Sequence, residues 1–323
     1  MLKGMKQADL GLNLTTKRTR KREFLDEMDR VVPWAALVAL ITPFAPEGKR
    51  GRPPFAVQTM LRIHFMQQWF TLSDPAMEEA LHDIALFREF AGLDWDSRLP
   101  DETTILRFRR LLEKHKLGVE ILKLVNDLLR DKGLLLRAGT VVDATLIAAP
   151  TSTKNASGER DPEMHQSKKG NQWYFGMKAH IGVDAESGLV HTVRTTAGNV
   201  NDVVEANSLL HGEEADAFGD AGYQGVAKRS DAKPEVTWHI AMRPGRRNAL
   251  DLSSPLAAMI DKSQQILAGI RAKVEHPFRV IKRQFGFTKV RYRGLKKNAA
   301  QVQTLFALSN LWMARRKLMA GAA

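Results

Sequence analysis

The fold is decided by the stretch Thr140-Val-Val-Asp-Ala-Thr-Leu-Ile147, where the helical spacing of the preceding residues ends. We predict a strand here, because β-branched and apolar residues favour strands. Asp143 interrupts this run, and Asp220 likewise follows a short apolar run at 215–218. Each carboxylate is therefore expected near the carboxyl end of a strand, where ligands collect in open α/β sheets.

Strands and helices alternate along the chain after residue 133. Further strands are predicted at 173–183, 189–196, 215–218 and 236–241, with a hairpin turn between the first two. Helices are predicted at 202–210, from about 225, at 257–284 and at 298–317, and loops at 150–172 and 243–248. This order indicates a mixed α/β layer with antiparallel strands first and parallel crossings later. We therefore expect residues 133–323 to form one α/β domain.

The earlier part of the chain has helical spacing. Residues 31–132 are predicted to form an all-helical domain, with helices at 33–41, 56–70, 73–91, 101–115 and 119–132. Short helices with tight turns fit a DNA reader of the helix-turn-helix kind and a helical packing domain equally well. Residues 1–30 are predicted to be a basic arm that runs into a helix near residues 23–30, and the arm is either a solvated tail or a segment that binds phosphates.

The net charge of +13 is the strongest signal in the composition. It favours a polyanionic partner, nucleic acid first and an anionic membrane surface second. The chain has no cysteine, which excludes disulfides, thiolate nucleophiles and cysteine zinc sites. We see no apolar run long enough to span a membrane, no signal peptide and no phosphate-binding loop for a nucleotide cofactor. A cytoplasmic protein, nucleoid-associated when bound to DNA, is expected.

A third acidic residue, Glu275, stands in a basic stretch. Arg271, Glu275 and Lys282 are 4 and 7 residues apart, so a helix would place all three on one face. Pro277 predicts a kink or break just before it, because proline removes a helical hydrogen bond. Residues 271–297 hold ten Lys or Arg and several aromatic residues. This stretch is either a solvated basic face or a groove that holds a DNA strand.

The three carboxylates together suggest a site for Mg²⁺. Asp143 or Asp220 alone would fit an ordinary strand-end cap. If their strands are neighbours, however, the two like charges repel unless a cation lies between them. Carboxylate oxygens suit Mg²⁺, and two such ions about 3.5–4 Å apart support an in-line displacement at phosphorus. We therefore expect two Mg²⁺ ions, for which Mn²⁺ can substitute.

These motifs resemble those of the DDE transposases of bacterial insertion sequences, specifically the insertion-sequence-5 family of the insertion-sequence-4-like group. The matching segments are Val-Val-Asp143-Ala-Thr, the stretch from Asp161 to Asp184, Gly-Asp220-Ala-Gly-Tyr and Arg271-x3-Glu275-x6-Lys282. The helical region from Trp34 to His115 also resembles that family's N-terminal domain. One departure is Ala268, which stands where the family signature has tyrosine.

The resemblance implies an RNase H-like core with Asp143, Asp220 and Glu275 as catalytic metal ligands. It also implies a double-stranded DNA substrate, namely the inverted-repeat ends of the element and a target, which a homodimer would cut and join. DNA contacts are expected from Arg271, Lys282, Arg279, Lys168, Lys169, Lys178, Tyr223 and Arg283. The alternatives are a DNA-binding protein whose catalytic function is lost, such as a domesticated transposase, and an RNase H-like nuclease that does not join DNA.

Overall fold

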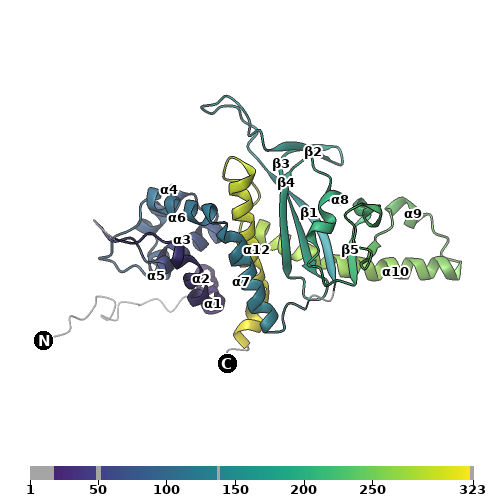
Figure 1. Cartoon of the computed structure of the whole chain (residues 1–323), viewed down its shortest axis with the longest axis horizontal. Helices are drawn as coiled ribbons and strands as arrows, with labels where there is room; N and C mark the ends of the chain where they lie inside the picture. The colour runs from purple at the N-terminus through teal and green to yellow at the C-terminus, as the bar shows by residue number, and fades with distance from the viewer. Residues whose placement is uncertain (1–17, 49–51, 137–138, 321–323) are drawn as a thin grey trace.

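The computed structural model describes residues 18–48, 52–136 and 139–320. Figure 1 shows a group of helices from the first part of the chain and a sheet flanked by helices from the rest. The predicted order, helices first and a mixed α/β layer after them, is confirmed. Most of the basic arm predicted for residues 1–30 lies outside the described residues.

Seven α-helices precede the sheet in the described part of the chain. They are α1 (Arg20–Val31), α2 (Trp34–Ile41), α3 (Val57–Phe70), α4 (Asp74–Asp83), α5 (Ala85–Ala91), α6 (Glu102–Lys114) and α7 (Leu117–Asp131). Three of them begin after a side chain that accepts a backbone hydrogen bond from the first turn: Thr19, Ser73 and Asp101. Such caps satisfy N–H groups that have no partner within the helix. We call α1 to α7 the helical region.

The single helix predicted over residues 73–91 is wrong. Ile84 has an extended backbone (φ −112°, ψ 99°) and divides this stretch into α4 and α5. On one continuous helix, Phe90 would point about 140° away from Met77, at roughly 100° per residue. Both side chains are buried in the same core. The break therefore lets both ends of the segment face that core.

Six strands form one sheet. They are β1 (Thr140–Ala148), β2 (His165–Lys169), β3 (Gln172–Asp184), β4 (Val190–Ala197), β5 (Asp216–Gly219) and β6 (Thr237–Ile240). The sheet order is β2-β3-β1-β5-β6, and β4 also pairs with β3. The pairs among β1, β2, β3 and β4 are antiparallel, whereas β5 pairs in parallel with β1 and β6. The predicted change from antiparallel to parallel strands is confirmed.

The loop predicted over residues 150–172 is wrong at its end, because β2 lies within it. β2 has no apolar residue and is held by its backbone pairing with β3, from His165 opposite Gly176 to Lys169 opposite Gln172. Gly170, with a positive φ of 61°, lies in the turn between the two strands. A prediction based on apolar alternation misses a strand of this kind.

The helix predicted from about residue 225 is also wrong. Two short 3₁₀ turns, Ala221–Tyr223 and Val226–Lys228, stand there instead. Gly225 between them has a φ of 91°, which interrupts a right-handed helix. The basic loop predicted at 243–248 contains the short helix α9 (Pro244–Asn248), whose proline suits a first helical turn.

Other helices of this region lie close to their predicted positions. The helix predicted at 202–210 is α8 (Asp202–Glu205), continued by a 3₁₀ turn over Ala206–Leu209. The helix predicted at 257–284 is a nearly continuous series: α10 (Pro255–Arg271), a 3₁₀ turn (Ala272–Val274), α11 (Glu275–Arg279) and a π turn (Val280–Gln284). The irregularity predicted before Pro277 is therefore confirmed. The last helix is α12 (Leu295–Ala320).

Helix α12 joins the two parts of the molecule. It lies between the helical region and the sheet in Figure 1 and packs against α1, α7 and β4. One continuous hydrophobic core runs from the helical region through α12 to the sheet. The predicted domain boundary after residue 132 falls between α7 and β1, but apolar packing continues across it. No helix among the described residues is long and apolar enough to cross a membrane.

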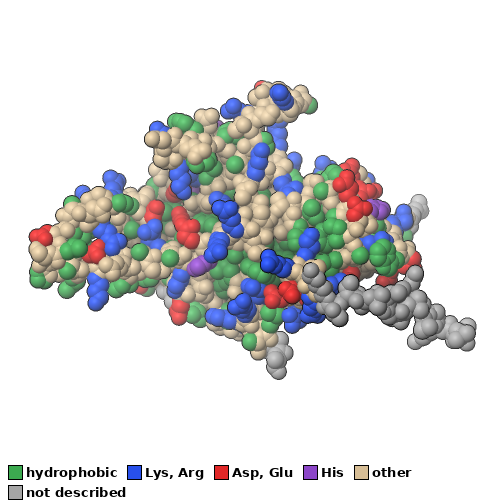
Figure 2. All heavy atoms as spheres, turned by 180° about the vertical axis from the view of Figure 1, so that it is seen from behind, with side chains coloured by type: hydrophobic (Ala, Val, Ile, Leu, Met, Phe, Trp, Pro, Cys, Tyr) green, Lys and Arg blue, Asp and Glu red, His purple; other side chains and the backbone are tan. Residues whose placement is uncertain are grey.

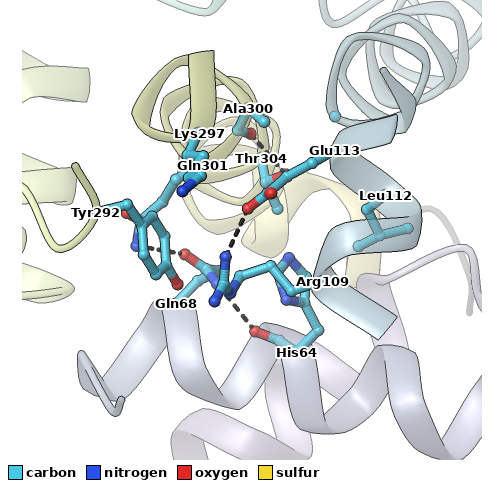
Figure 3. A pocket seen from close by; sticks show the side chains of 11 residues that line it. His64, Gln68, Arg109, Leu112, Glu113, Tyr292, Lys297, Ala300, Gln301 and Thr304 are labelled. Carbon is cyan, nitrogen blue, oxygen red and sulfur yellow. Dashed lines mark hydrogen bonds and ion pairs between the residues drawn. The ribbon is translucent and has the colours of Figure 1, made fainter. Parts of the chain in front are cut away.

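A buried polar cluster lies where α12 and the segment before it meet the helical region. Figure 3 shows Arg109 of α6 directed toward Glu113, with Tyr292 and Gln301 beside it, around a cavity of 20 Å³. Arg109 donates to Glu113 (2.6 Å) and to Asp74 (2.9 Å), and its guanidinium lies 4.0 Å from the centre of the Tyr292 ring. The three charged side chains are only 10–14% exposed. This cluster thus fixes residues that follow α11 against the helical region.

Candidate active site

The parallel pairing of β1 with β5 brings the two predicted aspartates together. Thr140 pairs with Ala217 and Val141 with Phe218. Two residues further along the same register, Asp143 stands beside Asp220. Neighbouring strands are about 4.8 Å apart, and residues in register point to the same face. Both side chains are half-buried. The predicted convergence of these carboxylates at strand ends is therefore supported by the pairing.

Glu275 reaches the same place from the helix series. The 3₁₀ turn before it packs against β1. Val274, Phe278 and Ile281 are buried, as their predicted helical face requires, and this leaves Glu275 on the exposed side of α11. An open cavity of about 150 Å³ lies between helix and strand. It is lined by Val142, Asp143, Ala268, Arg271, Ala272, Val274 and Glu275.

The electrostatics of Asp143 are consistent with this arrangement. Burial raises the pKa of its carboxyl to about 7, the hydrogen bond from the Ala144 N–H opposes the shift, and the negative charges of Asp220 and Glu275 add to it. A carboxylate that is costly to ionise beside other carboxylates gains most from a bound cation. The oxygen donors present fit a hard divalent cation such as Mg²⁺.

The cations predicted next to Glu275 also lie at the site. Arg271 lines the cavity. The Lys282 ammonium donates to the Thr145 hydroxyl (2.6 Å) and to the Leu146 carbonyl (3.0 Å). Burial lowers the pKa of Lys282, as does the charge of Lys169, while the charge of Glu275 opposes the shift. The change from α to 3₁₀ to π geometry thus keeps both cations beside β1, although they do not share one regular helix.

The other predicted DNA contacts fall into two groups. Lys168, Lys169, Arg279 and Arg283 have exposed side chains. Figure 2 shows Lys and Arg spread over much of one face of the molecule, with smaller groups of Asp and Glu between them. Such a surface suits a polyanion. DNA could therefore reach the exposed side chains of Lys168, Lys169, Arg279 and Arg283.

Lys178 and Tyr223 have different surroundings. Lys178 is opposite Leu146 in the β1–β3 pairing, so its side chain projects from the sheet face opposite to that of Asp143. Its ammonium donates to Asp202 (2.9 Å) and to the Val200 carbonyl (2.7 Å). The side chain of Tyr223 is 1% exposed. Neither side chain is presented at the surface in the way the sequence prediction assumed.

Asp202 is a charged neighbour of this site that the sequence reasoning missed. Its charge also raises the pKa of Asp143, after those of Asp220 and Glu275. From the sequence we interpreted either Asn201 or Asp202 as the cap of this helix. The structure gives the cap to Asn201, whose side chain accepts from the Val203 N–H. Its ion pair with Lys178 places Asp202 on the sheet face opposite to that of Asp143, near enough for its charge to act on the Asp143 carboxyl.

Another group of possible ligands lies away from these carboxylates. Among the described residues, His191, His211 and Glu214 have ligand atoms within 4.8 Å of one another. They surround Thr140 at the start of β1, whose hydroxyl donates to Glu214 (2.8 Å). The Glu214 carboxylate also accepts from the Gly212 N–H (2.7 Å). These bonds give it a structural function in holding the chain before β5 against β1.

Comparison with known families gives two matches. Residues 135–311, more than half of the 323-residue chain, match the family described as "Transposase DDE domain". Residues 13–111 match the family described as "Transposase domain (DUF772)". No solved structure matches the chain. The helical region and mixed sheet are accordingly those of a transposase with an RNase H-like DDE core. Its narrower place in the insertion-sequence-5 family stays a prediction. The chain belongs to the DDE transposases of insertion sequences, enzymes that cleave DNA and transfer its strands.

Proposed function

We propose that this transposase binds the terminal inverted repeats of its insertion sequence, cleaves the DNA ends and joins them to target DNA by two-metal-ion phosphoryl transfer. The observation that carries the proposal is the convergence of three distant segments: Asp143 and Glu275 line one open cavity, and the β1–β5 pairing brings Asp220 next to Asp143. Each of these carboxylates alone could be explained as an ordinary cap, but that explanation does not account for all three together. As a set they form a cation site.

In this mechanism the three carboxylates would hold Mg²⁺, for which Mn²⁺ can substitute. When bound, a pair of such ions activates the attacking oxygen and stabilises the leaving one. Arg271 and Lys282, beside the cavity, would bind phosphates next to the cleaved bond and fix its direction. Water is the nucleophile in cleavage, and the freed 3′-hydroxyl is the nucleophile in joining. Because one site serves both steps, no covalent bond between protein and DNA is needed.

The test uses the full-length protein with double-stranded DNA that carries the element's ends. With Mg²⁺ we expect cleavage at the ends and strand-transfer products, and with EDTA neither. Glu275→Gln should abolish both, whereas Glu235→Gln, an exposed glutamate in the loop before β6, should not. Binding without cleavage would favour the inactive DNA-binding protein. Cleavage without strand-transfer products would favour the nuclease.

We also propose that two copies act together, because two ends must be cut and joined, and that the helical region binds the ends or forms the dimer. Mass photometry of the protein with end DNA should show a complex with two protein chains. A complex that retains one chain per DNA end under conditions of strand transfer would contradict the dimer.

DNA affinity is expected to depend steeply on salt. A protein that makes six or more phosphate contacts loses about 10³-fold in affinity between roughly 50 and 200 mM salt, because bound counterions are released. Arg279→Ala, an exposed cation on α11, should reduce the slope of log K against log salt by about 1. Fluorescence anisotropy at a series of salt concentrations measures both. An affinity that does not change with salt would contradict a basic DNA-binding surface.

A further inference from the structure

The tip of the hairpin formed by β2 and β3 projects beyond the rest of the sheet. The pairing of β3 with β1 ends at Gly176, and its pairing with β4 ends at Met177. The Phe175 carbonyl still accepts from the Ala149 N–H (2.8 Å), but before it β3 pairs with β2 alone among the described residues. Figure 1 shows this hairpin at the upper end of the sheet. Side chains at its tip are therefore available to a partner.

Trp173 is the last member of an apolar row on one face of β3. Side chains alternate along a strand, so Trp173 shares a face with Phe175 and, further along, with Ile181. Ile181 pairs with Asp143, so this is the face of the proposed catalytic aspartate. Ile181 is fully buried in the core and Phe175 packs against it, whereas Trp173 is 63% exposed. The apolar row therefore extends past the core of its own chain.

The surroundings of Trp173 are basic. Lys168 stands opposite Trp173 in the β2–β3 pairing, and its ammonium lies 6.0 Å from the centre of the indole ring. Lys169 follows in the chain, and both lysine side chains are exposed. Residues 165–183 contain no aspartate or glutamate. The hairpin tip thus presents an open aromatic ring together with positive charge.

The loop before β2 adds cations on the same face. The Arg160 guanidinium lies 5.6 Å from the centre of the Phe175 ring, so it stands on the face that carries Trp173. Arg293 donates to the Arg160 carbonyl (3.4 Å), and both arginine side chains are exposed. Along β1, the contact of Lys282 with the strand comes between the catalytic cavity and the start of this loop. Positive charge therefore continues from the cavity toward the hairpin.

A DNA base fits this surface better than a second copy of the chain does. DNA is the substrate of a transposase, and it combines flat apolar bases with phosphates. Proteins that hold unstacked strands use aromatic rings for the bases and Lys or Arg for the phosphates. A second copy carries the same net charge of +13 and would bring like charge to the hairpin. The end DNA is the DNA that the proposed site holds through both cleavage and joining, so it is the natural source of the base.

We propose that Trp173 stacks on a base of the end DNA that is unstacked from its neighbours, and that Lys168 and Lys169 bind the phosphates beside that base. The inference rests on the proposed function. Trp173 lies eight residues along β3 from Ile181, so at about 3.3 Å per residue it is at most about 26 Å from the level of Asp143. At 3.4 Å per base pair, the base lies within about eight base pairs of the cleaved bond.

Fluorescence anisotropy of full-length protein with end DNA in EDTA measures affinity without cleavage. Trp173→Ala should bind about 5- to 150-fold more weakly, which is the contribution of one stacked base. Trp173→Phe should retain most of the affinity, whereas Trp173→Leu, apolar but not aromatic, should not. Trp173→Ala should leave the slope of log K against log salt unchanged, while Lys168→Gln should reduce it by about 1. Leu136→Ala removes another exposed apolar side chain and should bind like the wild type.

An abasic scan of the end DNA locates the base. One abasic site is placed in turn at each position of that range, on either strand. At one position the ratio of wild-type to Trp173→Ala affinity should fall to about 1, because the partner of the ring is then absent for both proteins. A ratio that stays high at every position would contradict stacking.

Two further results would overturn the inference. Wild-type affinity of Trp173→Ala for intact end DNA would do so and would leave the proposed function intact, provided that the wild type cleaves. Loss of protein dimers by Trp173→Ala in mass photometry without DNA would make a second copy the partner of the ring. The variant should melt within about 1 °C of the wild type, because its side chain is exposed. No binding of end DNA by the wild type would remove the proposed function and this inference together.

Discussion

Asp143→Asn is expected to abolish Mg²⁺-dependent DNA cleavage and, in the absence of metal, to make the protein more stable. Catalysis falls because the variant loses a charged ligand at the centre of the proposed site. A bound metal contributes several kcal/mol to the transition state, so the loss should exceed about 10³-fold. Stability rises because the half-buried wild-type carboxylate is costly to ionise, and asparagine carries no charge there.

The gain in stability should depend on pH. The ordinary pKa of an aspartate is 3.8, and in the folded protein burial raises that of Asp143 to about 7. The folded state therefore holds a proton that the unfolded state releases, and the wild type loses stability as the pH rises through this range. Asparagine does not titrate. The advantage of the variant should be absent near pH 4 and complete above pH 7.

Thermal unfolding in EDTA at several pH values measures this effect. Because Asp143 is partly exposed, we expect about 1–2 kcal/mol rather than the full shift, which corresponds to a rise of roughly 4 °C at pH 8. Asp96→Asn, at an exposed loop position, is the control and should change neither stability nor cleavage. An Asp143→Asn protein that cleaves end DNA like the wild type would refute the catalytic assignment.

Arg109→Ala is expected to cause the largest loss of stability. Its guanidinium binds both Asp74 and Glu113, and all three side chains are nearly buried. Removal of one partner from such a cluster leaves uncompensated buried charge, which costs about 3–5 kcal/mol. The contact with the Tyr292 ring is lost as well. A fall of about 10 °C in the melting temperature is therefore expected.

Arg110→Ala provides the matched control, because Arg110 is the next residue on α6 and is exposed. It should melt within about 1 °C of the wild type, since surface substitutions cost little. Differential scanning calorimetry of both variants measures this difference in melting temperature. Equal melting temperatures for Arg109→Ala and Arg110→Ala would show that the buried cluster does not stabilise the contact between the helical region and α12.

The sequence analysis correctly predicted the helices and strands whose apolar residues recur at regular spacing. The strand around Asp143, the change from antiparallel to parallel strands, and the irregular backbone before Pro277 all follow from spacing and from residue chemistry. The prediction failed where contacts between distant segments overrode the local preference of the sequence, or where the sequence had no apolar pattern to indicate a strand. Ile84 breaks a helix so that two parts of it face one core, and β2 exists because β3 offers it backbone partners.

The chain by itself determined which residues bear chemistry: three carboxylates in recognisable contexts, cations spaced around the third, and a charge suited to DNA. Such features are local, so they can be read one segment at a time. Only the tertiary structure decided which side chains share a space. Strand register sets Asp143 beside Asp220, and packing pairs Lys178 with Asp202 on the opposite face of the sheet while it buries Tyr223. Those outcomes depend on contacts between distant segments, which no spacing along the chain encodes.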